Sequence, residues 1–295
     1  MKIILFSRRQ LSHTAAEICQ LFDALRLFGF DYAVNEEFAP LVTELTGMQI
    51  PPEKVYGHCV GRQPADSLMV CYGGDGTLLE GVHRLCGAPI PVMGINAGHL
   101  GFLTSAPSAG LNLIFEEVAA GRLTTEPRSM IEATGDYAEQ PDTELGLNEF
   151  TVQRHGAGMI SVETYVDDQM VATYHGDGVI FSTPTGSTAY SLSAGGPVVE
   201  PTARNFIVSP ICAHSVHANA YVLSPERVIT VQTEKNSYKP VLLSVDGGRA
   251  FSLRSGDSIE VRRSKFDTKL VRLSKRSFCE ILQKKMLMGG TSNEE

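Results

Sequence analysis

The stretch Ser67-Leu-Met-Val-Cys-Tyr72-Gly-Gly-Asp-Gly-Thr77 decides the fold of this chain. Its first six residues carry no charge and form a short apolar run, which is typical of a buried strand. The glycines end that strand at once, and helical spacing follows from Leu78 to Cys86. A buried strand that passes through a glycine turn into a helix indicates a parallel sheet covered by helices, with ligands at the carboxyl ends of its strands.

The same alternation of strand and helix extends to both sides of that stretch. Lys2 to Ser7 and Ile90 to Ile95 are predicted to be buried strands, and Thr14 to Phe28 and Leu111 to Ala120 are predicted to be helices. We therefore expect an α/β N-terminal domain over residues 1–127, a parallel sheet with flanking helices.

After about Pro127 the pattern changes to β-branched runs separated by Gly, Asp, Asn or Pro turns. Such a pattern predicts an all-β C-terminal domain, here over residues 128–276. A last helix is predicted at Ser277 to Leu287, and we expect the segment 277–295 to pack back on the N-terminal domain. The predicted strands are Phe150 to Gln153, Ile160 to Val166, Val171 to Tyr174, Val179 to Ser182, Val228 to Gln232, Val241 to Val245 and Ile259 to Arg262.

Composition excludes several classes of protein. The chain has 295 residues, 43% of them hydrophobic, which is enough for a large buried core and argues against disorder. A formal net charge of −8 argues against a nucleic-acid partner. No apolar stretch approaches the roughly 20 residues that a membrane span needs, and the N-terminus does not resemble a secretory signal, so no membrane partner is expected.

The six cysteines show no C-x-x-C pair and no spacing typical of a metal site. This argues against a disulfide framework and a zinc site, and it favours a reducing, cytoplasmic location. His214 and His217 form a His-x-x-His arrangement, but no carboxylate or cysteine nearby completes a tetrahedron. We expect these histidines to form hydrogen bonds rather than to bind a metal.

The glycine turn from Gly73 to Thr77 has the features of a phosphate-binding loop. Glycines let a backbone approach a ligand closely, and the start of a helix offers unpaired N–H groups to phosphate oxygens. The alternative is a tight turn in which Asp75 or Thr77 caps the helix, and the turn alone favours neither interpretation. It has no Walker lysine and no G-x-G-x-x-G pattern, so it is neither a P-loop nor a dinucleotide fingerprint.

Two further segments are polar or rich in glycine. The loop from Gly94 to Leu103 would bring Asn96 and Phe102 to the same sheet edge, although an ordinary connection with Phe102 in the core is favoured when the loop is taken alone. Asn148-Glu149 places an amide beside a carboxylate at the start of a strand. Such a pair can bind a base amino group and a ribose hydroxyl, but it is more often a solvated strand end.

The run from Asp177 to Gly196 is dense in small hydroxyl residues, with Tyr190 near its middle. We expect the part from Thr183 onward not to be a core element. Packed hydroxyls supply many neutral donors, and a tyrosine ring offers a flat face to an adenine. A Ser/Thr-rich surface loop is the alternative, which the Pro, Tyr and Leu within the run disfavour.

Taken in order, these segments resemble the NAD kinase family. The resemblance covers most of the chain and implies ATP-dependent phosphorylation of the adenosine-ribose 2′-hydroxyl of NAD to give NADP and ADP. The long hydroxyl run is specific to that family, whereas Gly-Gly-Asp-Gly-Thr is shared with phosphofructokinases and with diacylglycerol and sphingosine kinases. The motifs are Gly-Gly-Asp-Gly-Thr at 73–77, Gly-His-Leu-Gly-Phe at 98–102, Asn-Glu at 148–149, the run from Asp177 to Pro197 and Val-Asp-Gly at 245–247.

The resemblance implies a role for each motif. Asp75 would be the catalytic carboxylate beside the ribose hydroxyl, and Gly73, Gly74, Gly76 and Thr77 would bind the ATP phosphates. The residues implied to bind NAD are Asp75, Gly76, Phe102, Asn148, Glu149, His175, Asp177, Thr188, Ala189, Tyr190, Ser191, Leu192 and Ser193. Family members are usually oligomeric, which implies a homo-oligomer, either a dimer or a tetramer.

The expected cofactor is a divalent ion, Mg²⁺ or Mn²⁺, because the glycine turn has no lysine to neutralise the ATP phosphates. ATP oxygens and water would hold that ion, so no protein metal site is predicted. Four positions depart from the pattern expected of bacterial members: Glu80 and His175 where basic residues are common, Asn219 where arginine is frequent, and Gly248 where glutamine is frequent. A lipid or sugar kinase with the same turn and a non-catalytic NAD-binding regulator are the alternative functions.

Overall fold

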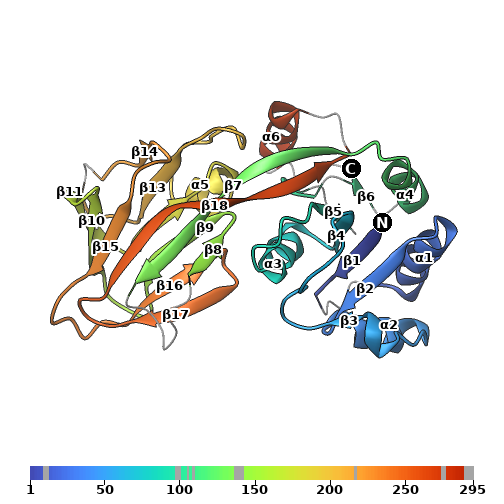
Figure 1. The fold of residues 1–295 in the computed structure, drawn as a ribbon. Coiled ribbons are helices and arrows are strands. Elements are labelled where there is room, and N and C mark those ends of the chain that lie inside the picture. The colour runs from blue at the N-terminus through green and yellow to red at the C-terminus, as the bar shows by residue number, and fades with distance from the viewer. Residues whose placement is uncertain are drawn as a thin grey trace. The chain divides into compact units, whose positions relative to one another are not determined.

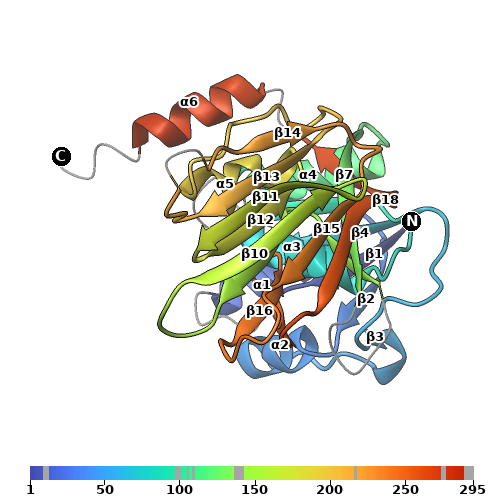
Figure 2. The ribbon, with the colours of Figure 1, turned by 90° about the vertical axis from the view of Figure 1, so that its left-hand side faces the viewer.

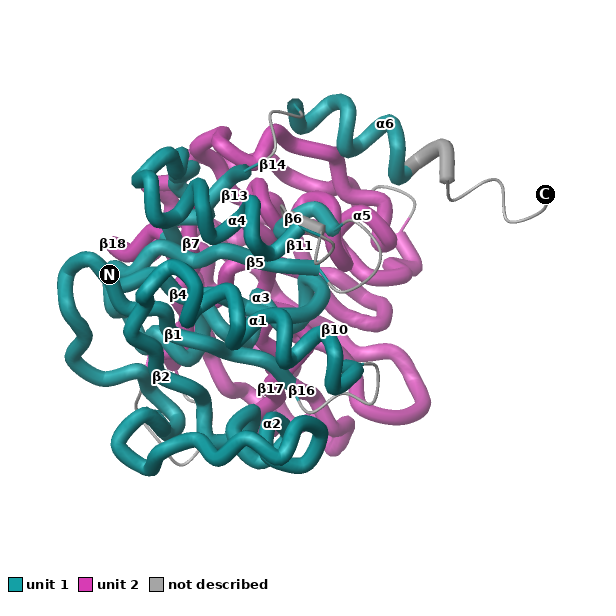
Figure 3. The backbone as a smooth tube through the Cα atoms, turned by 90° about the vertical axis from the view of Figure 1, so that its right-hand side faces the viewer, with its two compact units in different colours: residues 1–127, 268–295 teal, residues 128–267 magenta. Residues whose placement is uncertain are grey.

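The computed structural model describes residues 1–8, 13–96, 101–104, 106–107, 110–135, 143–215, 218–273 and 277–288. The chain divides into two compact units, which are described separately: unit 1 comprises Met1–Pro127 and Thr268–Glu295, and unit 2 comprises Arg128–Asp267 (Figure 3). The unit boundaries fall within β7 (Thr124–Gly135) and β18 (Ser258–Arg272). No helix in these ranges is long and apolar enough to cross a membrane.

Unit 1 is built on a parallel sheet, so the α/β architecture predicted from the sequence is confirmed. Three of its strands, β1 (Lys2–Phe6), β4 (Ser67–Tyr72) and β5 (Val92–Asn96), consist almost entirely of buried residues, because both faces of the sheet are covered. The short β6 (Ala106–Pro107) and the end of β18 each pair with β5 in parallel. The strand order is β3 (Val55–Tyr56), β2 (Asp31–Asn35), β1 (Lys2–Phe6), β4 (Ser67–Tyr72) and β5 (Val92–Asn96) (Figure 1).

Helices cover both faces of this sheet. α1 (Ala15–Leu27), α2 (Phe38–Thr46) and α4 (Leu111–Ala119) bury their apolar sides in one core cluster with β1, β4 and β5. α3 (Asp75–Arg84) packs on the side of β4 that carries Cys71. The sequence analysis did not predict α2 or β2.

The last helix, α6 (Phe278–Met288), belongs to unit 1. The ring centres of Phe278 and Phe102 lie 6.5 Å apart, and Lys285 Nζ lies 4.5 Å from the centre of the Phe102 ring. Ile281 is buried. The C-terminal segment therefore packs back on the α/β unit, as predicted.

Unit 2 is an antiparallel β structure with one core between two groups of strands, which confirms the predicted all-β class (Figures 1 and 2). The strands predicted from the sequence did not include β7, β8 (Glu144–Gly146), β13 (Phe206–Ile211), β14 (Tyr221–Leu223) or β17 (Arg249–Leu253). The first group contains β11 (Gln169–Gly176), β10 (Ile160–Val166), β15 (Ile229–Thr233) and β18, with β7 paired to β18 and to β8 (Glu144–Gly146). The second contains β14 (Tyr221–Leu223), β13 (Phe206–Ile211), β12 (Gly178–Ser182), β9 (Glu149–Arg154), β16 (Val241–Val245) and β17 (Arg249–Leu253).

A disulfide joins Cys59 and Cys86 in unit 1, so the expectation that the cysteines form no disulfide was wrong. The two residues are 27 positions apart, and their Cα atoms lie 5.8 Å apart. They meet because the segment after β3 is held to the end of α3, where the Val60 N–H donates to the carbonyl of Arg84. Sequence spacing cannot show such a pairing, because it depends on where the helix ends.

We predict that thiol titration of the unfolded, unreduced protein finds the four free cysteines, Cys19, Cys71, Cys212 and Cys279, and that six are found after reduction. Closing a loop of this length stabilises a fold by about 3 kcal/mol in the chain-entropy model. Cys59→Ser should therefore lower the melting temperature in the absence of reductant, whereas Cys279→Ser, at an exposed free thiol, should not. Six thiols before reduction would contradict the pairing.

Candidate active site

The glycine turn forms an open helix N-terminus in unit 1. β4 ends at Tyr72 and α3 begins at Asp75, with Gly74 at the N-cap position and no side-chain cap. The interpretation in which Asp75 or Thr77 caps the helix is therefore wrong. The first N–H groups of α3 remain suited to an anion.

Thr77 adds a hydroxyl to this turn. Its side chain is 1% exposed, and within the described residues its Oγ1 has no hydrogen-bond partner. A Cβ at Gly73 would lie 2.5 Å from that oxygen, and φ of Gly73 is +151°, so only glycine fits there. A buried hydroxyl without a partner beside an open helix N-terminus is suited to a phosphate oxygen.

The Asp75 carboxylate lies against the loop that follows β5. Oδ2 accepts a hydrogen bond from the Phe102 N–H at 2.7 Å, and Oδ1 accepts from the N–H groups of Leu103 and Thr104 at 3.2 and 3.0 Å. The Thr104 hydroxyl also lies 3.2 Å from Oδ1. Oδ1 is thus surrounded by donors, whereas Oδ2 has one donor and keeps a lone pair for a ligand.

Gly101 makes this approach possible. A Cβ at position 101 would lie 1.8 Å from Asp75 Oδ1, so any side chain there would displace the carboxylate. The Gly101 N–H donates to Thr104 Oγ1 at 3.1 Å, and the Phe102 carbonyl accepts two hydrogen bonds from Arg272, each 3.2 Å long. The loop is therefore held on both sides of Asp75. Residues 98–100 of the predicted motif lie outside the described residues.

A charged cluster that the sequence did not reveal lies beside the turn. Arg8 follows β1, and its Nε lies 2.5 Å from Glu80 Oε2. Glu80 also accepts from Arg84 Nη2 at 3.0 Å, and Arg84 in turn pairs with Glu37 at 2.7 Å. The pair of arginines directly after the first strand was the available signal, because the carboxyl ends of parallel strands meet at one edge.

In unit 2, Asp246 holds the Asn148-Glu149 segment in place. Its Oδ1 accepts from the N–H groups of Asn148 and Glu149 at 2.7 and 2.9 Å, and its Oδ2 accepts from the Leu147 N–H at 2.9 Å. Both predicted residues are buried, with exposed fractions of 8% and 6%. The expectation of a solvated strand end is therefore wrong for this pair.

The Glu149 side chain has an unusual environment. Its burial, together with the nearby Asp246 carboxylate, raises the pKa of Glu149 to about 8, although a hydrogen bond from the Tyr190 backbone opposes the shift. Oε2 has no hydrogen-bond partner among the described residues. A protonated Glu149 at neutral pH can donate to a ligand as well as accept from one.

The hydroxyl run is more buried than its composition predicts. Ser182, Thr183, Thr185, Ser187 and Ser191 are at most 4% exposed, so the expectation that the run is not a core element was wrong. Their hydroxyls are satisfied inside the protein, for example Thr183 Oγ1 by the Leu147 carbonyl at 2.6 Å. The run folds as a 3₁₀ helix (Thr185–Thr188) and a single turn, α5 (Tyr190–Ser193).

The surface of this run presents a few of the predicted residues. Tyr190 is 38% exposed, whereas Thr188, Ala189 and Leu192 are half-buried. Burial raises the pKa of Tyr190, and the charges of Cys212, Asp177 and Glu149 raise it further. Unit 2 therefore gathers Glu149, Asp177 and Tyr190 into one cluster.

Asp177 and His175 are both engaged by protein groups. Arg154 Nε lies 2.6 Å from Asp177 Oδ1, and this hydrogen bond lowers the pKa of Asp177. His175 is exposed, with Nδ1 2.9 Å from Ser161 Oγ. The His214 N–H donates to the carbonyl of His175, whereas His217 lies outside the described residues.

Both units of the chain match known proteins. The family profile of the ATP-NAD kinase N-terminal domain matches residues 20–123, and that of the ATP-NAD kinase C-terminal domain matches residues 147–273. The NAD kinase of Christiangramia forsetii is 32% identical over 98% of each chain. The chain belongs to the NAD kinase family. The NAD kinase of Symbiobacterium thermophilum is 40% identical over 74% of this chain and 78% of its own.

Two solved structures are similar to this chain in fold. A yeast NADH kinase complexed with NADH is similar in fold, with a TM-score of 0.82 and 24% identity, covering 100% of this chain and 89% of its own. An NAD kinase from Archaeoglobus fulgidus in complex with ATP has a TM-score of 0.73 and 26% identity, covering 97% of this chain and 99% of its own.

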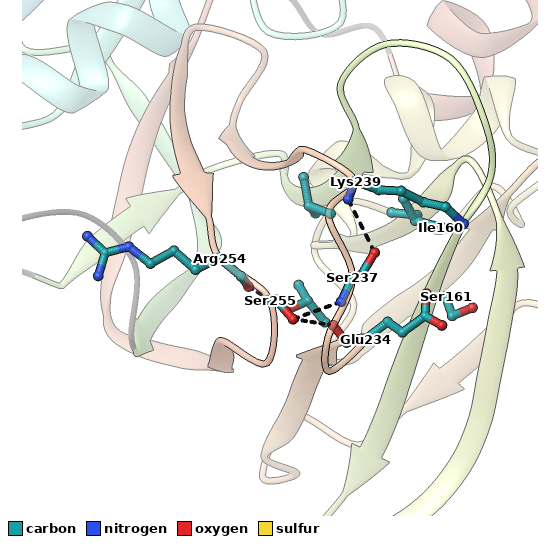
Figure 4. A pocket seen from close by; sticks show the side chains of 9 residues that line it. Ile160, Ser161, Glu234, Ser237, Lys239, Arg254 and Ser255 are labelled. Atoms are coloured by element: carbon teal, nitrogen blue, oxygen red, sulfur yellow. Dashed lines mark hydrogen bonds between the residues drawn. The ribbon is translucent and has the colours of Figure 1, made fainter.

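Two other features of this NAD kinase do not form part of these clusters. A pocket in unit 2 is crossed by hydrogen bonds from Ser255 Oγ to the Glu234 carbonyl and from the Ser237 N–H to Ser255 Oγ (Figure 4). His58, Cys59 and Cys86 have ligand atoms within 4.8 Å of one another. The disulfide uses both sulfurs, and Arg84 Nη1 lies 2.7 Å from His58 Nδ1, so this group does not suit a metal.

We predict that Gly101→Ala displaces the Asp75 carboxylate. The added methyl group would overlap Asp75 Oδ1, and overpacking of this kind costs about 1–3 kcal/mol. NADP formation should fall at least tenfold, with a lower melting temperature. Gly110→Ala is the matched control, because a Cβ there meets nothing within 4 Å. Equal activity in the two variants would contradict the proposed fit.

We predict that Glu149 makes stability fall as pH rises. The folded-state pKa of about 8 lies above the ordinary value of 4.5, so the folded protein retains a proton that the unfolded chain loses. The free energy of unfolding should drop by about 1.4 kcal/mol per pH unit between these two values and not change further above pH 8. Denaturant titrations at several pH values give the free energy of unfolding of wild type and of Glu149→Gln, and the difference between the two should change with this slope. A difference independent of pH would contradict it.

Proposed function

We propose that Asp75 is the catalytic carboxylate of this NAD kinase and that the turn from Gly73 to Thr77 binds the ATP phosphates. The observation that carries this proposal is the placement of a carboxylate, with one oxygen still able to accept, at the open N-terminus of α3. An anion on the N–H groups of α3 would lie beside Asp75. The nucleophile and the phosphoryl donor can thus meet at one side chain.

Asp75 takes part in proton transfer in this proposal. The ribose 2′-hydroxyl donates a hydrogen bond to Asp75 Oδ2, and its oxygen forms a bond to the γ-phosphorus while the bond from phosphorus to the β–γ bridging oxygen breaks. The hydroxyl becomes acidic as the new bond forms, so its proton passes to the carboxylate late in the reaction. The N–H groups of Phe102, Leu103 and Thr104 keep the carboxylate in position.

We propose that the unit 2 cluster binds NAD. Asn148 and Glu149 would hold the adenosine half, with protonated Glu149 donating to a ribose or base acceptor. The exposed face of Tyr190 would stack on a base, next to Thr188, Ala189, Leu192 and Ser193. Ser191 would act through packing, because its buried hydroxyl meets Ser209 Oγ at 3.1 Å. His175, Asp177 and Phe102 remain predicted contacts of NAD.

A divalent ion, Mg²⁺ or Mn²⁺, would neutralise the β- and γ-phosphates when ATP is bound. Three backbone N–H groups already donate to the Asp75 carboxylate, and the lone pair left on Oδ2 is assigned in this proposal to the ribose hydroxyl rather than to a metal. We therefore propose that ATP oxygens and water hold the ion. A homo-oligomeric form and a cytoplasmic location also stay predictions, and the Cys59–Cys86 disulfide gives the latter no support.

We predict that Asp75→Asn lowers kcat by about 10²- to 10⁴-fold, because an amide cannot take the proton. The affinity for NAD, measured by calorimetry, should stay within a few-fold of wild type. NADP formation is measured with an NADP-specific dehydrogenase after incubation with ATP, Mg²⁺ and NAD. A near-normal rate in the variant would remove the assigned role, and NAD binding by wild type without turnover would favour a non-catalytic regulator instead.

A further inference from the structure

Arg8 lies beside the glycine turn and is not part of any of the sequence motifs. It lies in the segment after β1, the strand next to β4 in the sheet. A Cβ built on Gly76 would lie 3.3 Å from Arg8 Nη1, so the guanidinium lies directly against the backbone of the turn. Gly76 is the second residue of α3, where the helix offers unpaired N–H groups.

The orientation of Arg8 is fixed by Glu80. Glu80 lies on α3, one helical turn after Gly76, and accepts the Arg8 Nε hydrogen bond at 2.5 Å. Its other oxygen accepts from Arg84 at 3.0 Å, so the carboxylate is held between two guanidinium groups. In the described part of the chain Glu80 is the only hydrogen-bonded partner of the Arg8 side chain, and the Nη groups therefore keep their donors.

We propose that Arg8 binds the triphosphate of ATP at the turn from Gly73 to Thr77 and that Glu80 is the positioning residue that aims it there. This proposal rests on the proposed phosphate site. A guanidinium can bond a carboxylate through Nε and a phosphate through its Nη groups at the same time, which the single ammonium of lysine cannot do in this geometry. The buried, unpaired hydroxyl of Thr77 lies in the same turn and supplies a second, neutral donor.

The experiment compares Arg8→Ala with Arg26→Ala, a matched loss of an arginine whose side chain is 74% exposed and pairs with Asp23 on α1. Arg8→Ala should raise the KM for ATP at least tenfold and leave the KM for NAD within twofold. Competition binding should show a loss of affinity that grows from AMP to ADP to ATP. Guanidinium ion added to Arg8→Ala should restore part of the rate, which it would not do for Arg26→Ala.

Two further variants separate binding from folding. Arg8→Lys keeps the charge but loses the two-sided contact, so its KM for ATP should lie between those of wild type and Arg8→Ala. Glu80→Gln should raise the KM for ATP several-fold, and the Arg8→Ala, Glu80→Gln double variant should be no worse than Arg8→Ala, because Glu80 acts through Arg8. Thermal melting shows that each variant is folded.

Several results would overturn the proposal. Arg8→Ala and Arg26→Ala could give the same KM for ATP, or Arg8→Ala could lose affinity equally for AMP, ADP and ATP. If the wild type forms NADP and Arg8→Ala has the same KM for ATP, the proposed role of Arg8 is wrong but the proposed function stands. A wild-type protein that forms no NADP from ATP and NAD would instead end the proposed function.

Discussion

The hydrogen bonds from the loop after β5 to the Asp75 carboxylate are the interaction on which the unit 1 site depends. They join the carboxyl ends of two neighbouring strands, β4 and β5, at one side chain. The Asp75 carboxylate is half-buried, and these backbone N–H donors hold its two oxygens in one orientation. The same bonds select Gly101, since no larger residue leaves room for the carboxylate. Position 75 is thus specified by packing as well as by chemistry.

In unit 2 a carboxylate also accepts hydrogen bonds from backbone N–H groups, but there the carboxylate positions a neighbouring segment. Asp246 accepts three backbone N–H groups and thereby fixes the Asn148-Glu149 segment. Glu149 then lies beside a carboxylate that is already satisfied, in a buried environment, and it holds its proton to about pH 8. Two adjacent carboxyl groups therefore have different tasks: one orders the backbone, and the other can act as a neutral donor.

The sequence predicted what depends on local pattern and failed where distant segments meet. The apolar strands and the glycine turn predicted the α/β unit, whereas the turn alone did not decide between an open and a capped start of α3. The hydroxyl run misled, because its side chains bond to carbonyls such as that of Leu147, 36 residues away in the chain. The sequence also did not predict the Arg8–Glu80 pair, whose members are 72 residues apart, or the Cys59–Cys86 disulfide. Which side chains meet depends on how distant strands and helices are placed against one another. The hydrophobic period of the sequence does not predict that placement.

The acidic residue at position 80 can be explained by its neighbours. Burial pushes the pKa of Glu80 upward, but the hydrogen bonds and charges of Arg8 and Arg84 outweigh it, and the pKa falls below its ordinary value. Glu80 is therefore ionised at neutral pH and keeps both arginines in place. A basic residue there would face Arg84 one helical turn away and repel it. The positive charge beside the turn thus comes from the segment after β1, where Arg8 lies against Gly76.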